Sequence, residues 1–232
     1  MLVPHELRAA QAATLAAPRF RYDLFSRVLF LTVDLLYGRR RSLEKFLVLE
    51  QLARVPYQAW ERLAQRALAR SRGRSSLAWL VMERVAEARA QQDNEQLHLL
   101  VLEELLVEER AAPLGRFRYR LLPAMLAGPW HLFSWLLHLV RPSWSYRLNA
   151  NFEDHAEHEY MAYVAEHPEL DHRAVLGPIA RACTRAHSVA DLLRQIGHDE
   201  RVHKLESLER CDRTQGPATP SSPSGATAPR AA

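Results

Sequence analysis

Two Glu-x-x-His motifs constrain the fold of this chain more than any other feature of its sequence. Glu95 and His98 form the first motif, and Glu200 and His203 form the second. On a helix, side chains three residues apart project from the same face, so each motif can place a carboxylate and an imidazole on one metal ion. One such motif is weak evidence, because charged helices contain this pair by chance.

A lone glutamate precedes each motif at a similar distance. Glu50 precedes Glu95 by about as many residues as Glu153 precedes Glu200. Glu50 directly follows the apolar run 46–49, which places it at the edge of a buried face. Two helices that each supply a glutamate, together with two that each supply Glu-x-x-His, form the ligand set of di-iron carboxylate bundles. We therefore predict an all-α, ferritin-like four-helix bundle with a di-iron core.

The charges of this ligand set suit two divalent ions. Four carboxylates and two neutral imidazoles balance the charge of the ions, so the centre can be buried without a net charge. Mixed oxygen and nitrogen ligands with open positions favour iron over zinc. The predicted cofactor is therefore a pair of iron ions. The other glutamates of the 75–110 region are interpreted as solvated surface residues: Glu83, Glu87, Glu103 and Glu104.

The pattern of apolar residues predicts successive helices with short breaks. Glycine is scarce, at 8 of 232 residues, and no stretch alternates between apolar and polar residues. Ser42, Ser143 and Ser188 are expected helix caps, Gly38 is expected to end a helix, and Pro56 is expected to kink or divide one. The expected helices cover 22–37, 42–70, 75–110, 143–166 and 188–210, and a shorter one is expected from about Pro129 to Val140.

Three segments of different character divide the chain. Residues 1–20 are interpreted as an N-terminal extension, and residues 21–211 form the predicted bundle. Residues 212–232 are rich in proline and contain no aromatic side chain, so they are predicted to be a disordered tail. Cys183 and Cys211 stand alone in the sequence, which argues against a disulfide framework or a thiolate zinc site.

The segment 121–140 contains no formal charge. Pro123, Gly128 and Pro129 are expected to break its first half, which would leave a helix of about 18 Å, shorter than the ~30 Å hydrocarbon core. We therefore predict that this segment and the apolar segment 22–37 lie in one leaflet of a membrane. The alternative is that both are core helices of a soluble bundle. The expected interfacial side chains are Arg116, Arg118, Arg120, Arg141, Trp130, Trp135 and Trp144.

Four stretches of the chain resemble the signature motifs of the alternative oxidases, which are membrane-bound di-iron quinol oxidases. They are Leu49-Glu50-Gln51, 94–99 (NEQLHL), 152–156 (FEDHA) and 199–203 (DERVH), and the resemblance covers roughly 20–210. It implies a reaction that couples ubiquinol oxidation to the four-electron reduction of O2 to water, without proton pumping. It also implies a set of iron ligands: Glu50, Glu95, His98, Glu153, Glu200 and His203.

The resemblance implies roles for further residues. Asn94 and Asp199 are expected to hold the ligand histidines from outside the metal site. Tyr160 lies two helical turns after Glu153 and is expected to donate an electron during O2 reduction, although packing is the alternative for a tyrosine at this spacing. The expected quinone-binding residues are Lys45, Leu49, Phe152 and Ala156.

The chain departs from the family pattern at three positions. Lys45 occupies a place where the family has arginine, so contacts with the quinone head group are expected to differ. His155 replaces an acidic residue of the third motif, and Glu159 replaces a small hydroxyl residue. His155 and His158 are interpreted as lying outside the metal site or at the surface.

Two other functions stay open at this point: a di-iron quinone-precursor hydroxylase on the same scaffold, and a non-catalytic iron-binding bundle. The net charge of +4 does not indicate nucleic-acid binding, because the arginines flank apolar helices. The expected partners are ubiquinol or another membrane quinol, O2, one leaflet of a membrane and a second copy of the chain. The expected location is monotopic, on the cytoplasmic face of a bacterial inner membrane or the matrix side of the mitochondrial inner membrane.

Overall fold

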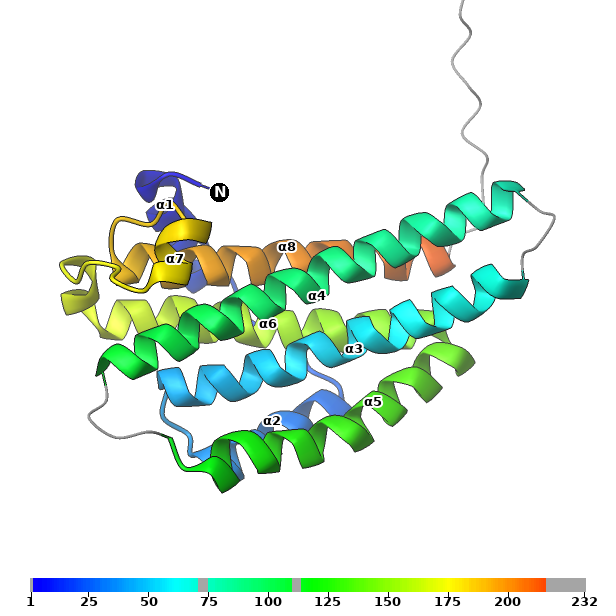
Figure 1. Ribbon diagram of the computed structural model, residues 1–232, viewed down its shortest axis with the longest axis horizontal. Coiled ribbons are helices and arrows are strands. Elements are labelled where there is room, and N and C mark those ends of the chain that lie inside the picture. Colours follow the sequence, from blue (N-terminus) through cyan, green and yellow to red (C-terminus); the bar gives the residue numbers. More distant parts are fainter. Residues whose placement is uncertain (1, 71–74, 110–113, 216–232) are drawn as a thin grey trace, which may run out of the picture.

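The structure is a computed structural model that describes residues 2–70, 75–109 and 114–215, and within these ranges it contains helices but no strand. Its four long helices are α3 (Leu43–Arg70), α4 (Ser75–Glu109), α6 (Pro142–Glu166) and α8 (Val189–Gln215). Helix α3 packs along α4, and α6 packs along α8 (Figure 1). The prediction of an all-α bundle is therefore confirmed.

The remaining helices cover the outside of this bundle. Helices α2 (Leu24–Tyr37) and α5 (Leu122–Val140) lie on the same side of it (Figure 1), and a π-helical turn at Phe117–Leu121 leads into α5. Helix α1 (Pro4–Ala16) packs on α8 and α6, and α7 (Pro178–Cys183) packs on α4; a short 3-10 turn covers Pro168–Asp171. In the part of the chain described here, no helix is both long and apolar enough to cross a membrane.

Two of the three predicted serine caps are confirmed. The backbone N–H groups of Lys45 and Asp191 lie 3.3 and 3.1 Å from the hydroxyls of Ser42 and Ser188. The prediction for Ser143 is wrong, because α6 already begins at Pro142, whose missing N–H is harmless in the first turn. Gly38 ends α2 as predicted, with a φ of +92° that favours glycine.

Pro56 does not divide α3, which continues to Arg70. A proline inside a helix leaves the carbonyl four residues earlier without its donor, and for Pro56 that carbonyl belongs to Leu52. The indole Nε1–H of Trp130 donates to this Leu52 oxygen over 3.2 Å. Helix α5 therefore supplies the hydrogen bond that Pro56 removes, and Trp130 is turned toward the bundle instead of toward a membrane interface.

The predicted break within 121–140 is wrong. Helix α5 runs from Leu122 to Val140 without interruption. Pro123 lies in the first turn, where its missing N–H has no helical partner to lose. Pro129 lies in the interior and removes one backbone bond without ending the helix.

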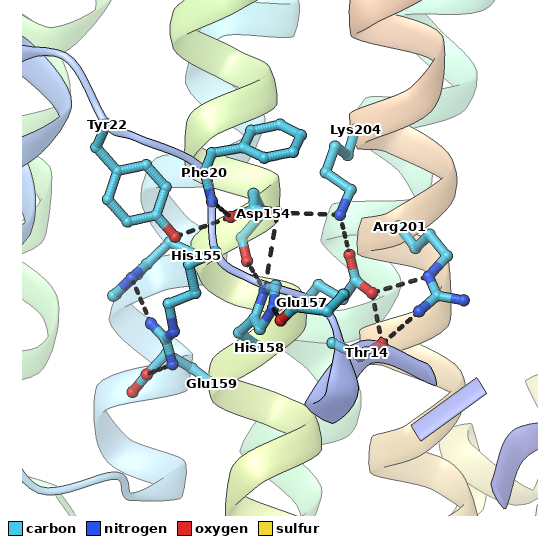
Figure 2. Close-up of polar contacts among 12 residues, drawn as sticks. Thr14, Phe20, Tyr22, Asp154, His155, Glu157, His158, Glu159, Arg201 and Lys204 are labelled. Carbon is cyan, nitrogen blue, oxygen red and sulfur yellow. Dashed lines mark hydrogen bonds and ion pairs between the residues drawn. The ribbon is translucent and has the colours of Figure 1, made fainter. Parts of the chain in front are cut away.

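A buried network ties the N-terminal segment to the bundle (Figure 2). The Asp154 carboxylate on α6 accepts hydrogen bonds from the Phe20 backbone N–H at 3.0 Å and from the Tyr22 hydroxyl at 2.9 Å. It also pairs with the Lys204 ammonium of α8 at 3.1 Å. The buried Asp154 carboxylate thus helps to hold the segment between α1 and α2 on the bundle.

Glu157, one turn later on α6, holds α1 itself (Figure 2). Its carboxylate contacts Lys204 at 2.5 Å, Arg201 at 2.8 Å and the Thr14 hydroxyl at 2.6 Å. Burial opposes ionisation of Glu157, but the bonds from Lys204, Thr14 and Arg201 lower its pKa below the usual value. Residues 1–20, interpreted above as an extension, therefore include a helix packed on the bundle.

Helix α8 extends to Gln215, so residues 212–215 of the predicted tail are helical. The rest of that tail, 216–232, lies outside the described residues, and the domain boundaries stay a prediction.

We predict that Trp130→Phe lowers the free energy of unfolding by about 1 kcal/mol, because the Leu52 carbonyl loses its donor. In a Pro56→Ala background the Ala N–H can bond to this carbonyl, so the same substitution is expected to cost less. A double-mutant cycle by urea denaturation measures the difference. Equal costs in both backgrounds would show that the bond from Trp130 does not compensate for Pro56.

Candidate metal centre

The structure brings the six predicted ligand residues together inside the bundle. Each of the four long helices contributes, and every one of the six side chains is buried: Glu50 on α3, Glu95 and His98 on α4, Glu153 on α6, and Glu200 and His203 on α8. The Nδ1 atom of His98 lies 3.3 Å from a Glu50 oxygen and 3.2 Å from a Glu200 oxygen. The Nδ1 atom of His203 lies 2.7 Å from a Glu95 oxygen.

The six residues form two overlapping groups. One contains Glu50, Glu95, His98 and Glu200, and the other contains Glu95, Glu153, Glu200 and His203. Within each group the nearest ligand atoms lie within 4.8 Å of one another. Glu95 and Glu200 belong to both groups. The arrangement can therefore hold two metal ions, with these two carboxylates shared between them.

The inward-facing atoms of the six residues have no hydrogen-bond partner among the described residues outside this set. They include both carboxylate oxygens of Glu95 and of Glu200, the Oε2 atoms of Glu50 and Glu153, and both Nδ1 atoms. Buried carboxylates without donors are costly, and metal ions remove that cost by accepting the free lone pairs. The donor set of carboxylate oxygens and imidazole nitrogens fits iron.

The outward-facing ring nitrogens of the two histidines meet the residues expected to hold them. His98 Nε2 lies 3.3 Å from the Asp199 carboxylate, and His203 Nε2 lies 3.3 Å from the Asn94 side-chain amide. Gln195 donates to the other Asp199 oxygen over 2.8 Å. These contacts orient each ring so that its Nδ1 faces the site.

Two tyrosines hold the lone glutamates across the bundle. Tyr160 on α6 donates a hydrogen bond to Glu50 on α3, and Tyr57 on α3 donates one to Glu153 on α6 over 2.6 Å. Each bond fixes the outer carboxylate oxygen and leaves the inner one free for a metal ion. Sequence reasoning singled out Tyr160 and missed Tyr57, although both follow a lone glutamate by seven residues.

Three of the four glutamates that were predicted to be solvated surface residues are exposed. Glu83, Glu87 and Glu103 lie at the surface, whereas Glu104 is half-buried. The Glu104 carboxylate accepts hydrogen bonds from the backbone N–H groups of Ile179 and Ala180, at 2.8 and 2.9 Å. It therefore caps the start of α7 instead of being fully solvated.

The residues expected to bind quinone are all buried, on the part of α3 and α6 next to Glu50 and Glu153: Lys45, Leu49, Phe152 and Ala156. The Lys45 ammonium pairs with Asp34 of α2 at 2.5 Å. Their role in binding quinone stays a prediction.

The unusual residues of the third motif lie beside the site and contact protein groups. His155 stacks on the Phe30 ring at 4.0 Å, and burial lowers its pKa to about 4, which favours the neutral form. Glu159 pairs with Arg19 and Arg41. Neither side chain belongs to the two overlapping groups.

His158 forms a third acidic group with Asp154 and Glu157. Here, however, Lys204 and Arg201 already balance the two carboxylates, and His158 Nδ1 lies 2.8 Å from the Asp154 carbonyl oxygen. This group has the partners that the six central residues lack, so it does not require a metal ion.

Comparison with known protein families gives one match. The sequence model of the alternative oxidases matches residues 9–207, which span all four long helices and all six central residues. No curated protein sequence matches the chain.

We predict that Fe²⁺ binding releases protons and strengthens as the pH rises. Burial and the charges of Glu200 and Glu95 raise the pKa of Glu153 well above its usual value. Burial lowers the pKa values of His98 and His203, but the surrounding carboxylates outweigh it and raise both well above the usual value. The metal-free protein therefore holds protons on these groups, and metal binding must displace them.

Anaerobic titration calorimetry in buffers of different ionisation enthalpy measures this release. Glu103→Gln, at an exposed position of α4, is the matched control and should release as many protons as the unmodified chain. An Fe²⁺ affinity that is independent of pH would contradict the prediction.

Proposed function

Because the chain belongs to the alternative oxidase family, we propose that it oxidises a membrane quinol and reduces O2 to water. Membership of this family makes the chain an oxidoreductase, and ubiquinol is the proposed substrate. The observation that carries the proposal is the pair of buried glutamate and histidine groups that share Glu95 and Glu200. Reduction of O2 needs a redox-active group, and these residues could hold two iron ions, whereas a structural bundle has no need of such a site.

The six central residues would hold two iron ions, which supply the redox chemistry for O2 when bound. Every ligand side chain is buried, so the protein shields this site from bulk solvent. Tyr160 lies one hydrogen bond from Glu50, and we propose that its phenol donates an electron during the reduction of O2. The full reduction of one O2 takes four electrons, so two quinols are consumed per O2.

We propose that the quinol head group binds beside Lys45, Leu49, Phe152 and Ala156. Leu49 and Phe152 directly precede the ligands Glu50 and Glu153 in the sequence, which supports a short path for electrons. The Lys45 ammonium, paired with Asp34, supplies a donor for a quinol oxygen. It lacks the planar fork of arginine, so it can make only single-point contacts with the head group.

The exposed side chains of α2 and α5 support binding to one leaflet of a membrane. Both helices lie on one side of the bundle, and Phe25 of α2 contacts Phe133 of α5 with ring centres 5.3 Å apart. Arg141 lies over the exposed Trp144 ring at the end of α5, as expected at a lipid interface. The exposed large apolar residues of α2 and α5 are Leu24, Phe25, Val28, Leu31, Leu35, Met125, Leu132, Leu136, Leu139 and Val140.

We also propose that the chain forms a homodimer. It would lie on the cytoplasmic face of a bacterial inner membrane or on the matrix side of the mitochondrial inner membrane. Analytical ultracentrifugation of the detergent-solubilised protein tests the first, and protease protection of the native membrane tests the second.

We predict that the iron-loaded protein consumes O2 when ubiquinol is added, at two quinols per O2. Glu95→Gln should abolish this uptake because it removes a ligand shared by both groups, whereas Glu103→Gln on the same helix should retain it. An oxygen electrode combined with mass spectrometry of the quinone gives the stoichiometry and the product. Hydroxylated quinone would identify a hydroxylase instead, and absence of O2 uptake with two irons bound would contradict the proposal.

We predict that Leu35→Glu weakens binding to liposomes. Leu35 is 84% exposed on α2, and burying a leucine in lipid contributes about 1.5–3 kcal/mol, so binding should fall roughly tenfold or more. Val107→Glu is the matched control, because Val107 is 78% exposed on α4, outside the α2 and α5 surface. Equal losses for the two variants in a liposome sedimentation assay would show that α2 does not face the membrane.

A further inference from the structure

A row of aromatic rings runs from the metal centre toward the far end of the bundle. The Tyr57 ring lies 5.9 Å from the ring of the ligand His203, measured between ring centres. Trp60 lies 5.1 Å from Tyr57, and Tyr146 lies 4.8 Å from Trp60. The three residues form a buried cluster of their own together with Cys211, separate from the main core. Tyrosine and tryptophan are the side chains whose rings lose an electron most readily, so this row is a potential path for electrons.

The equivalent row on the Tyr160 side is interrupted. Tyr160 packs against Phe46 with ring centres 4.3 Å apart, and Phe46 in turn packs against Tyr163 at 5.3 Å. A phenylalanine ring is far harder to oxidise than tyrosine or tryptophan, so Phe46 does not relay an electron. Tyr57 and Tyr160 hold equivalent glutamates, but Tyr57 contacts the oxidisable ring of Trp60, whereas Tyr160 is separated from Tyr163 by Phe46.

The Tyr57 row ends in a pocket of about 290 Å³, lined by Trp60 and Tyr146. Arg84, Arg210 and Arg213 also line this pocket. Arg210 is paired with Glu87 at 3.2 Å, and Arg213 is paired with Glu209 at 2.6 Å. Among the described residues, Arg84 is the lining arginine without an ion pair, so its guanidinium can bind a small anion in this pocket.

His138 of α5 also lines the pocket, and its Nδ1 atom is buried without a hydrogen-bond partner. Burial and the charge of Arg84 lower its pKa to about 4, so the ring is neutral near pH 7. A neutral imidazole with a free polar atom adds a hydrogen-bonding group beside Arg84.

We propose that Tyr57, Trp60 and Tyr146 form an electron-transfer chain between this pocket and the metal centre, and that the pocket accepts a small, anionic, water-soluble reductant. The chain would provide a second entry for electrons, independent of quinol. This inference rests on the proposed function, because O2 reduction at the centre supplies the oxidant.

Each transfer moves one electron and restores every residue. Tyr57 loses an electron to the centre, and its phenolic proton moves along the 2.6 Å hydrogen bond to Glu153. Trp60 replaces that electron, and the proton returns to Tyr57. Tyr146 then reduces Trp60 and releases its phenolic proton into the pocket, and the reductant in the pocket returns one electron and one proton to Tyr146. Four such transfers, with four protons from solvent, convert one O2 to two molecules of water.

Ascorbate is a suitable probe, because it is an anion that gives up one electron and one proton. We expect the iron-loaded protein to consume O2 with ascorbate alone. Trp60→Phe and Tyr146→Phe should lower this uptake by about tenfold or more, while ubiquinol-driven uptake changes less than about twofold. Tyr163→Phe is the matched control, because Tyr163 lies beyond Phe46, and it should leave both rates unchanged.

A second measurement does not depend on turnover. Rapid-freeze electron paramagnetic resonance, after O2 is mixed with the reduced protein without quinol, should detect a radical on this aromatic chain, and Trp60→Phe should change its signal. Iron content and circular dichroism establish that the variants fold; Tyr146→Phe removes a single oxygen atom.

The outcomes separate the two proposals. If ubiquinol drives no O2 uptake in the iron-loaded protein, the proposed function fails. If ubiquinol drives uptake but the Trp60 and Tyr146 variants retain the full ascorbate rate and the same radical signal, the electron-transfer chain is refuted.

Discussion

The rest of the structure depends on the burial of four carboxylates whose inward-facing oxygens have no donor from the described residues outside the metal centre. Glu50, Glu95, Glu153 and Glu200 each retain at least one buried oxygen with no hydrogen-bond partner. In a medium of low dielectric constant, such charges repel strongly unless protons or metal ions lie between them. The four long helices hold these groups together, so the metal-free bundle keeps protons among them, and bound metal ions would replace those protons.

Two adjacent buried acidic residues of α6, Glu153 and Asp154, have different hydrogen-bond partners. Asp154 follows Glu153 directly, yet it meets Lys204, Tyr22 and a backbone N–H, which satisfy its carboxylate. Glu153 meets Tyr57 through one oxygen and leaves the other free. These two neighbouring side chains thus point to different sides of α6. Asp154 binds the N-terminal segment, and Glu153 completes the central site.

The convergence of the central residues could be predicted from the sequence, because the Glu-x-x-His spacing and the two lone glutamates are local helix properties. The family resemblance also indicated Asn94 and Asp199. Contacts that depend on distant partners could not be predicted: Trp130 compensating for Pro56, and α1 packing through Thr14 onto Glu157. Tyr57 could have been singled out from the sequence, because it follows Glu50 at the same spacing at which Tyr160 follows Glu153. Its hydrogen bond to Glu153 could not be predicted, because it depends on how α3 and α6 pack.

Iron content combined with Mössbauer spectroscopy of the purified protein tests the central claim most directly. Two shared carboxylates between two groups predict two irons per chain that are antiferromagnetically coupled in the oxidised state. Glu200→Gln, which alters one of the two shared carboxylates, should weaken the coupling. A single iron per chain, or two irons without magnetic coupling, would contradict the account.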